Sequence, residues 1–229
     1  MSDWWREVDA IIGQKSLLKH PFYQAWNEGK LGREDLAYYA TQYYQQEQRF
    51  PRYLSAVHSN CPELKTRQML WENMGHEEAG ENNHPELWLR FAESVGASRD
   101  SVENAVINEK TVACVSEFEK LARDNKWPVG LAALYAYEAQ QPAVAKTKIE
   151  GLKKFYGLTS KGAIGFFEMH QEMDAWHSAD EKAVLSAVAQ KDTGLREEIK
   201  AAVSRACDAL NGLLDGVCEK RGIHAACAA

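Results

Sequence analysis

The chain has 229 residues, of which 45% are hydrophobic and 26% are charged, and its formal net charge is −6 at pH 7. These values are ordinary for a soluble globular protein, and the length suffices for one large domain with a substantial core. The negative charge and the lack of a basic cluster argue against nucleic-acid binding, and no apolar run is long enough to span a membrane. The N-terminal segment lacks the apolar core of a signal peptide, so we expect a cytoplasmic protein.

Apolar residues recur at helical spacing along almost the whole chain. We expect Pro51 to kink one long helix that follows residues 31–35 and continues to about Ser59. No alternating, strand-like run exceeds four residues, so the sequence predicts a single all-α domain of eight to ten helices, with a flexible tail from about residue 221. In chain order, the segments with helical character are one capped by Ser2 or Asp3, a short piece at 20–26, the kinked helix, one from Pro62 toward Gly80, one from His84 through Val95, one capped by Ser98 or Ser101, and those at about 110–124, 128–140, 142–156, 160–176, 178–191 and 194–220.

The cysteines are odd in number and widely spaced. This pattern fits reduced thiols better than a disulfide framework, and it matches no zinc motif. We therefore expect no functional role for these five residues, which are Cys61, Cys114, Cys207, Cys218 and Cys227.

One stretch of the sequence carries a metal-site pattern. His170, Asp174 and His177 are separated by four and three residues, so in a helix they project from one stripe about two turns long. Two imidazoles and a carboxylate on one stripe are typical metal ligands. A surface helix with two histidines on its polar face is the alternative interpretation.

Other segments offer further ligands. Glu77 and Glu81 both precede His84 at helical spacing, and the spacing does not choose between them because Gly80 interrupts the pattern. Glu138 lies in a run of apolar, small and aromatic residues, and a buried carboxylate must be paired or bind a cation. Glu47 is either a supporting group or part of an exposed helix face. Three imidazoles and three carboxylates suit two iron or manganese ions with open positions for dioxygen.

Several sequence blocks in a fixed order carry a family resemblance. They are His20-x-Phe22-Tyr23-x-x-Trp26, Phe50-Pro51-x-Tyr53-Leu54-Ser55-Ala56-x-His58-Ser59, Glu77-Glu78-x-Gly80-x-x-Asn83-His84-x-x-Leu87-Trp88, Ala132-Ala133-Leu134-Tyr135-x-Tyr137-Glu138-x-Gln140-x-Pro142 and His170-x-Glu172-x-Asp174-x-x-His177. Through these blocks the chain resembles the haem-oxygenase-like dimetal oxidases, most closely the CADD-like family that makes 4-aminobenzoate. The resemblance implies one haem-oxygenase-like helical domain over residues 1–229, often a homodimer in this fold.

The resemblance also implies a site and a reaction. The metal ligands of the family fall on Glu77, His84, Glu138, His170, Asp174 and His177. The resemblance therefore favours Glu77 over Glu81. The ions would be two irons, or one manganese and one iron, primed by an external reductant and reacting with dioxygen. The family implies that Tyr23 is consumed as the source of the aromatic ring and that Lys148 donates the amino group, without an external aromatic substrate.

Two other functions are open at this point. One is a cofactorless oxidase similar to PqqC, which acts on a quinone-cofactor precursor and does not need six metal ligands. The other is a protein-interaction module, for which we find no exposed apolar stripe. Metal content separates the dimetal oxygenase from both alternatives.

Overall fold

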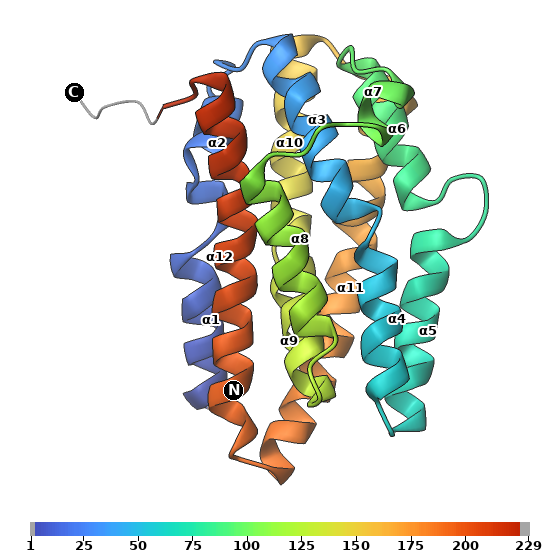
Figure 1. Cartoon of the computed structure of the whole chain (residues 1–229), viewed down its shortest axis with the longest axis vertical. Helices are drawn as coiled ribbons and strands as arrows, with labels where there is room; N and C mark the ends of the chain where they lie inside the picture. Colours follow the sequence, from blue (N-terminus) through green and yellow to red (C-terminus); the bar gives the residue numbers. More distant parts are fainter. Residues whose placement is uncertain (1–2, 225–229) are drawn as a thin grey trace.

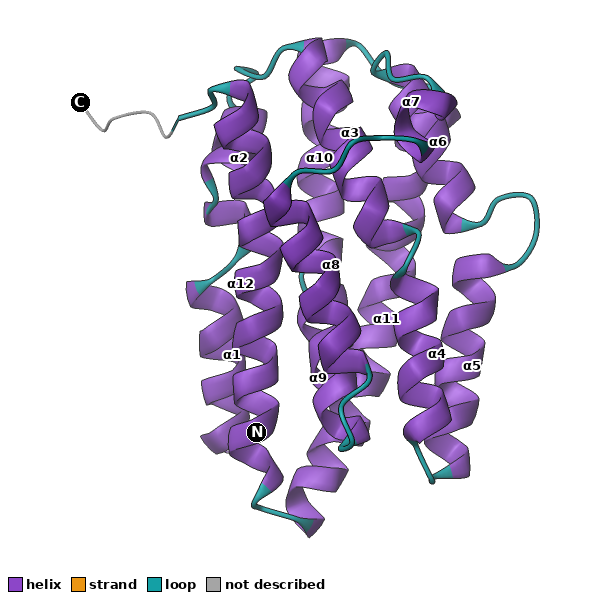
Figure 2. Ribbon diagram, in the orientation of Figure 1, coloured by secondary structure: helices purple, strands orange, loops and turns teal. Residues whose placement is uncertain are grey.

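The computed structural model describes residues 3–224, which form α-helices joined by short loops and contain no strand (Figures 1 and 2). The prediction of an all-α protein is confirmed. The helices are α1 (Asp3–Gln14), the 3₁₀-helix η1 (Leu17–Lys19), α2 (Pro21–Asn27), α3 (Arg33–Glu47), α4 (Phe50–Asn60), α5 (Leu64–Glu78), α6 (His84–Ser94), α7 (Arg99–Glu103), α8 (Glu109–Ala122), α9 (Trp127–Glu138), α10 (Gln141–Tyr156), α11 (Lys161–Lys191) and α12 (Leu195–Arg221).

Local sequence signals account for many helix ends. Asn83 and Ser160 cap α6 and α11 by accepting a hydrogen bond from a backbone N–H of the first turn. Proline stands in the first turn of α2, α4, α6, α9 and α10, where its missing N–H costs nothing. Gly157 and Gly222 end α10 and α12 in the left-handed conformation that glycine adopts without strain.

Two predicted boundaries are wrong. Pro51 does not kink one helix but stands in the first turn of α4, which is separated from α3 by Gln48 and Arg49. Conversely, the helices predicted at 160–176 and 178–191 are one continuous helix, α11, because no glycine or proline interrupts residues 166–191. Of the tail, the structure describes only residues up to 224, so the predicted flexibility beyond them, the role of Cys227 and capping by Ser2 lie outside the described residues.

The core is rich in aromatic side chains and includes residues from Trp4 on α1 to Cys218 on α12. Helix α9 is the most enclosed element, with every residue from Pro128 to Glu138 buried. The long helix α11 packs against α6, α9 and α10, while α4 packs against α5 and α9. Helices α3, α5, α6, α9 and α11 contribute the polar side chains that meet in the interior.

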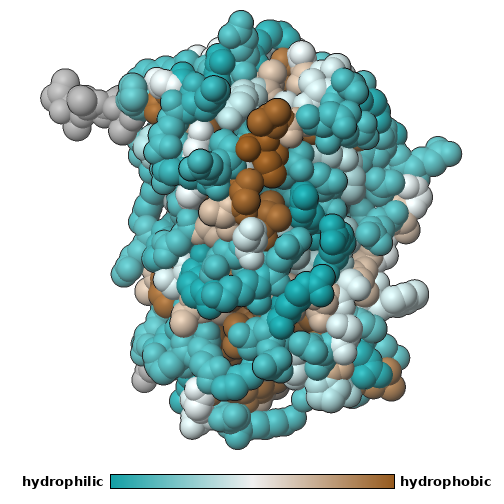
Figure 3. Space-filling view, in the orientation of Figure 1, coloured by the Kyte–Doolittle hydropathy of each residue, from teal (hydrophilic) through white to brown (hydrophobic). Residues whose placement is uncertain are grey.

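The surface is mainly polar. The face in Figure 3 is mostly hydrophilic, with a narrow apolar strip in its upper half and smaller apolar patches in its lower part. Among the described residues, no helix combines the length and apolar character that crossing a membrane requires.

Candidate metal centre

Histidines and carboxylates from four helices form two buried groups in the interior. The first consists of Glu47 on α3, His84 on α6 and His170 on α11, and the second of Glu138 on α9 with Asp174 and His177 on α11. Within each group, one potential ligand atom from every residue lies within 4.8 Å of the others. All six side chains are buried, so each group is shielded from water.

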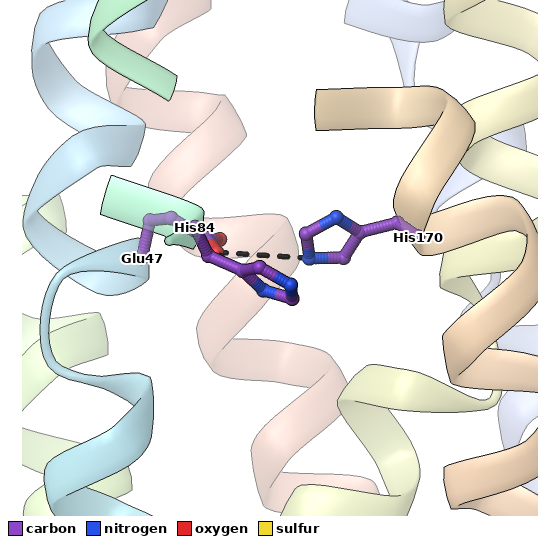
Figure 4. A group of neighbouring side chains, drawn as sticks. All are labelled: Glu47, His84 and His170. Carbon is purple, nitrogen blue, oxygen red and sulfur yellow. Dashed lines mark ion pairs between the residues drawn. The ribbon is translucent and has the colours of Figure 1, made fainter. Parts of the chain in front are cut away.

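In the first group, the two imidazoles meet a carboxylate. The His170 ring and the Glu47 carboxylate point toward one another, with the His84 ring beside the line that joins them (Figure 4). The distance from Glu47 Oε1 to His170 Nε2 is 3.7 Å, and that to His84 Nδ1 is 4.0 Å. Glu77 on α5 adjoins this group, because its Oε2 lies 2.6 Å from His84 Nδ1.

In the second group, the carboxylate of Glu138 faces α11. His177 Nδ1 lies 3.6 Å from Glu138 Oε1 and 3.9 Å from Asp174 Oδ1. Asn73 on α5 donates a hydrogen bond of 2.9 Å to Glu138 Oε1 and orients this carboxylate. The spacing within α11 therefore places His170 in one group and His177 in the other, about two helical turns apart along the same stripe.

Burial and mutual repulsion disturb the charges of these groups. Burial, assisted by the charge of Glu77, raises the pKa of Glu47 to about 7. Burial, with the charge of Glu138, raises the pKa of Asp174 well above its usual range. Burial lowers the pKa of His170 well below its ordinary value, so that its imidazole is neutral. For His84, burial opposes protonation but the carboxylates around it prevail and raise its pKa.

The hydrogen bonding of the polar atoms in the two groups indicates whether metal ions fit. Buried atoms that form no hydrogen bond among the described residues include His84 Nε2, Glu138 Oε2, Asp174 Oδ2 and His177 Nδ1. Unpaired polar atoms in the interior are costly, and buried carboxylates without cations more so. Divalent cations would satisfy these atoms and offset the negative charge, so the residues fit two metal ions.

The structure separates Glu77 from Glu81. Glu77 is buried and in contact with His84, whereas Glu81 is exposed in the loop between α5 and α6. All six sequence-predicted ligands therefore lie together in the interior, and their role as ligands stays a prediction. Glu47, which the sequence left open, is buried and belongs to the first group.

Sequence reasoning missed Glu181. This residue lies one helical turn beyond His177 on α11, is fully buried, and neither of its carboxylate oxygens has a hydrogen-bond partner among the described residues. Burial, together with the nearby charge of Glu138, raises its pKa well above the usual range. Extending the spacing of His170, Asp174 and His177 by four residues would have found it.

Lys148 on α10 is a fully buried amine among aromatic rings. Its Nζ donates a hydrogen bond of 2.6 Å to the hydroxyl of Tyr39, and it lies 5.7 Å from the centroid of the Tyr23 ring. Burial lowers the pKa of Lys148 to about 7, against the opposing charge of Glu47. The two sequence-predicted reactive residues are thus neighbours, and Tyr39 is the partner that sequence reasoning missed.

The buried Tyr23 hydroxyl lies beside that of Tyr39 and forms no hydrogen bond of good geometry. A series of ring contacts joins this aromatic cluster to the first metal-ligand group. Lys148 lies 5.3 Å from the Trp88 ring, Trp88 lies 4.8 Å from Phe166, and Phe166 lies 4.0 Å from His170. The lysine and the candidate metal centre are therefore parts of one interior.

Fold and site together define a helical protein with a candidate dinuclear metal centre beside a buried lysine and tyrosine cluster. The chain belongs to the family of iron-containing redox enzymes, whose model matches residues 37–211. It is 43% identical to a 4-aminobenzoate synthase of Nitrosomonas europaea, over 93% of this chain and 90% of the relative. It is also 37% identical to a 4-aminobenzoate synthase of Chlamydia muridarum, over 93% of this chain and 89% of the relative.

Solved structures agree on the fold. A TenA homologue from Pseudomonas syringae superimposes with a TM-score of 0.83 at 15% identity, over 95% of this chain and 93% of the other. The predicted resemblance to haem-oxygenase-like proteins related to 4-aminobenzoate synthases is confirmed.

Proposed function

We propose that this protein is a dioxygen-dependent dimetal oxygenase that makes 4-aminobenzoate from its own Tyr23, with Lys148 as the amino donor. The names of its relatives support the product. The observation that carries the proposal is the position of Lys148, a fully buried amine 5.7 Å from the Tyr23 ring, in the same interior as the candidate metal centre.

The residues that would hold the ions are those of the two groups together with Glu77. When bound and reduced, two iron ions, or one manganese and one iron, would supply the activation of dioxygen that oxidation of a phenol ring requires. An external reductant would prepare them.

The conversion makes specific demands on the protein. Tyrosine and 4-aminobenzoate share a para-substituted ring, so the reaction must break the Cα–Cβ bond, oxidise Cβ to a carboxyl group and replace the phenolic oxygen by nitrogen. An amine delivers nitrogen only in its neutral form. A pKa of about 7 leaves a large share of Lys148 neutral near pH 7, and Tyr39 holds its Nζ in place. The ring of Tyr23 is enclosed, which excludes bulk water from it.

Isotope labelling tests the proposal directly. The protein would be produced with ring-¹³C-labelled tyrosine and ¹⁵N-labelled lysine, loaded with Fe²⁺ and Mn²⁺ without oxygen, and then exposed to air with an unlabelled reductant. We expect both labels in the 4-aminobenzoate, at no more than one product per chain. Unlabelled product, or many products per chain, would show an external substrate.

Matched variants identify the residues. Tyr23→Phe and Lys148→Arg should abolish the product while metal binding is retained. Lys146→Arg, the same exchange at an exposed position two residues away, should leave the yield unchanged. Tyr39→Phe should still make product, because it retains the ring source. Product from Tyr23→Phe but not from Tyr39→Phe would instead make Tyr39 the source.

Metal analysis separates this proposal from its alternatives. A cofactorless oxidase or an interaction module would not need buried unpaired ligands on four helices. Metal content after loading with iron alone, with manganese alone and with both would distinguish a diiron from a manganese–iron centre. Homodimerisation stays a prediction, which light scattering after gel filtration would test.

A further inference from the structure

A histidine outside the predicted ligand set contacts His177. His76 on α5 lies with its Nδ1 3.0 Å from His177 Nε2, and the two rings stack with centroids 5.3 Å apart and an angle of 16°. His76 is partly buried, and the ring of Trp176 lies 5.6 Å from its own ring. Nothing in the proposed reaction uses this residue.

The two ring nitrogens of His177 face different partners. Its Nδ1 faces Glu138 and Asp174 and has no hydrogen-bond partner among the described residues. Its Nε2 faces His76. A histidine that binds a metal through one nitrogen usually donates its other N–H to an acceptor, which sets the tautomer and the orientation of the ring.

We infer that His76 is the positioning residue of the second metal-ligand group, and that its Nδ1 accepts a hydrogen bond from the Nε2–H of His177. This contact keeps the lone pair of His177 Nδ1 directed into the space beside Glu138 and Asp174, where the metal ion would bind. The inference rests on the proposed function, because it requires that this group binds a metal ion.

In the first group, the two nitrogens of the α11 histidine have exchanged roles. His170 Nδ1 lies 2.9 Å from the carbonyl oxygen of Phe166, a contact in which the ring must donate, so its Nε2 faces Glu47. The two groups would therefore use different nitrogens, Nε2 of His170 and Nδ1 of His177. The first group takes its supporting acceptor from its own helix, whereas the second takes it from α5.

Helix α5 supports both groups from one face. Asn73, His76 and Glu77 are spaced by three and one residues, and they contact Glu138, His177 and His84 respectively. Positions separated by three or four residues share a helix face, so these three side chains reach the centre together. A substitution at His76 is thus expected to affect the second group and leave the first in place.

The test compares two substitutions at this position. His76→Asn keeps an acceptor oxygen close to the position of Nδ1, whereas His76→Phe keeps a ring for stacking but removes the acceptor. His58→Phe is the control, because it makes the same exchange at a partly buried helical histidine outside both groups. Binding of Mn²⁺ and Fe²⁺ to each metal-free protein would be measured without oxygen by calorimetry and by competition with a chelator.

We expect His76→Phe to weaken binding of one of the two ions by roughly 10- to 100-fold, the usual effect of removing such a partner. The other ion should bind as in the wild type, and His76→Asn and the control should bind both ions as the wild type does. Two ions held at wild-type affinity by His76→Phe would overturn the inference. Equal weakening in both His76 variants would also overturn it, because ring packing and not the hydrogen bond would then be responsible.

Nuclear magnetic resonance of ¹⁵N-histidine-labelled protein loaded with diamagnetic Zn²⁺ gives an independent result that needs no variant. We expect His177 to carry its proton on Nε2, and a proton on Nδ1 would contradict the inference. A wild-type protein that binds no metal would defeat the proposed function and this inference together. A wild type that binds two ions without making 4-aminobenzoate would defeat the proposed function alone.

Discussion

Replacing Lys148 by methionine is expected to stabilise the metal-free protein at pH 7. Burial lowers the pKa of this amine from its ordinary 10.5 to about 7. Between these values the unfolded chain carries a proton that the folded protein has released, so the free energy of unfolding rises with pH across this window. Because one pKa unit corresponds to about 1.4 kcal/mol, the buried amine costs the folded protein roughly 4–5 kcal/mol at pH 7.

Methionine retains most of the length of the side chain without an ionisable group. It also loses the hydrogen bond to Tyr39, which costs about 1 kcal/mol. The net gain at pH 7 is therefore roughly 3–4 kcal/mol. Lys148→Arg should act in the opposite direction, because a guanidinium stays charged when it is buried.

Urea unfolding of the metal-free wild type and Lys148→Met at pH 8, 9 and 10 measures this difference. The advantage of the variant should shrink by about 1.4 kcal/mol for each pH unit as the unfolded lysine approaches its own pKa. This range lies above the pH at which Glu47, whose pKa burial raises to about 7, changes its charge. Lys146→Met, at an exposed site, should show no such trend. A difference for Lys148→Met that is constant with pH would refute the argument.

Three further predictions concern the centre and the core. Glu181→Gln should stabilise the metal-free protein at neutral pH, because burial raises the pKa of the Glu181 carboxyl group and its ionisation as the pH rises lowers the free energy of unfolding. The melting temperatures at pH 5 and pH 8 should therefore differ less in the variant than in the wild type. Each ion, at a free concentration 100 times its dissociation constant, should add about 2.7 kcal/mol to the free energy of unfolding. Urea titration with and without Mn²⁺ would measure this gain, and a chelator should reverse it. Gly151→Ala should destabilise the protein by roughly 1–3 kcal/mol, because the added Cβ would lie 2.3 Å from Trp26 Nε1. Gly212→Ala, where the new Cβ meets nothing within 4 Å, should instead stabilise by about 0.5–1 kcal/mol, and equal effects of the two changes would contradict this assignment.

The sequence alone indicated that the chain is helical and that His170, Asp174 and His177 share one face of α11. Both follow from spacing along one helix, which is local and periodic, so His170, Asp174 and His177 could be placed together without a structure. The apolar run around Glu138 likewise indicated burial, and α9 is enclosed on all sides. The helix ends at Pro51 and near residue 177 were wrong, because propensity does not decide whether neighbouring segments join.

Only the tertiary structure decided which side chains from different helices meet. Glu47, His76 and Tyr39 each lie on helices that carry many polar residues, and nothing in their own segments shows that they point inward. Their positions depend on how α3, α5 and α10 pack against α9 and α11, since helix periodicity specifies a face but not the partner of that face. The same packing buries Glu77 against His84, leaves Glu81 exposed to water, and divides the candidate ligands into two groups.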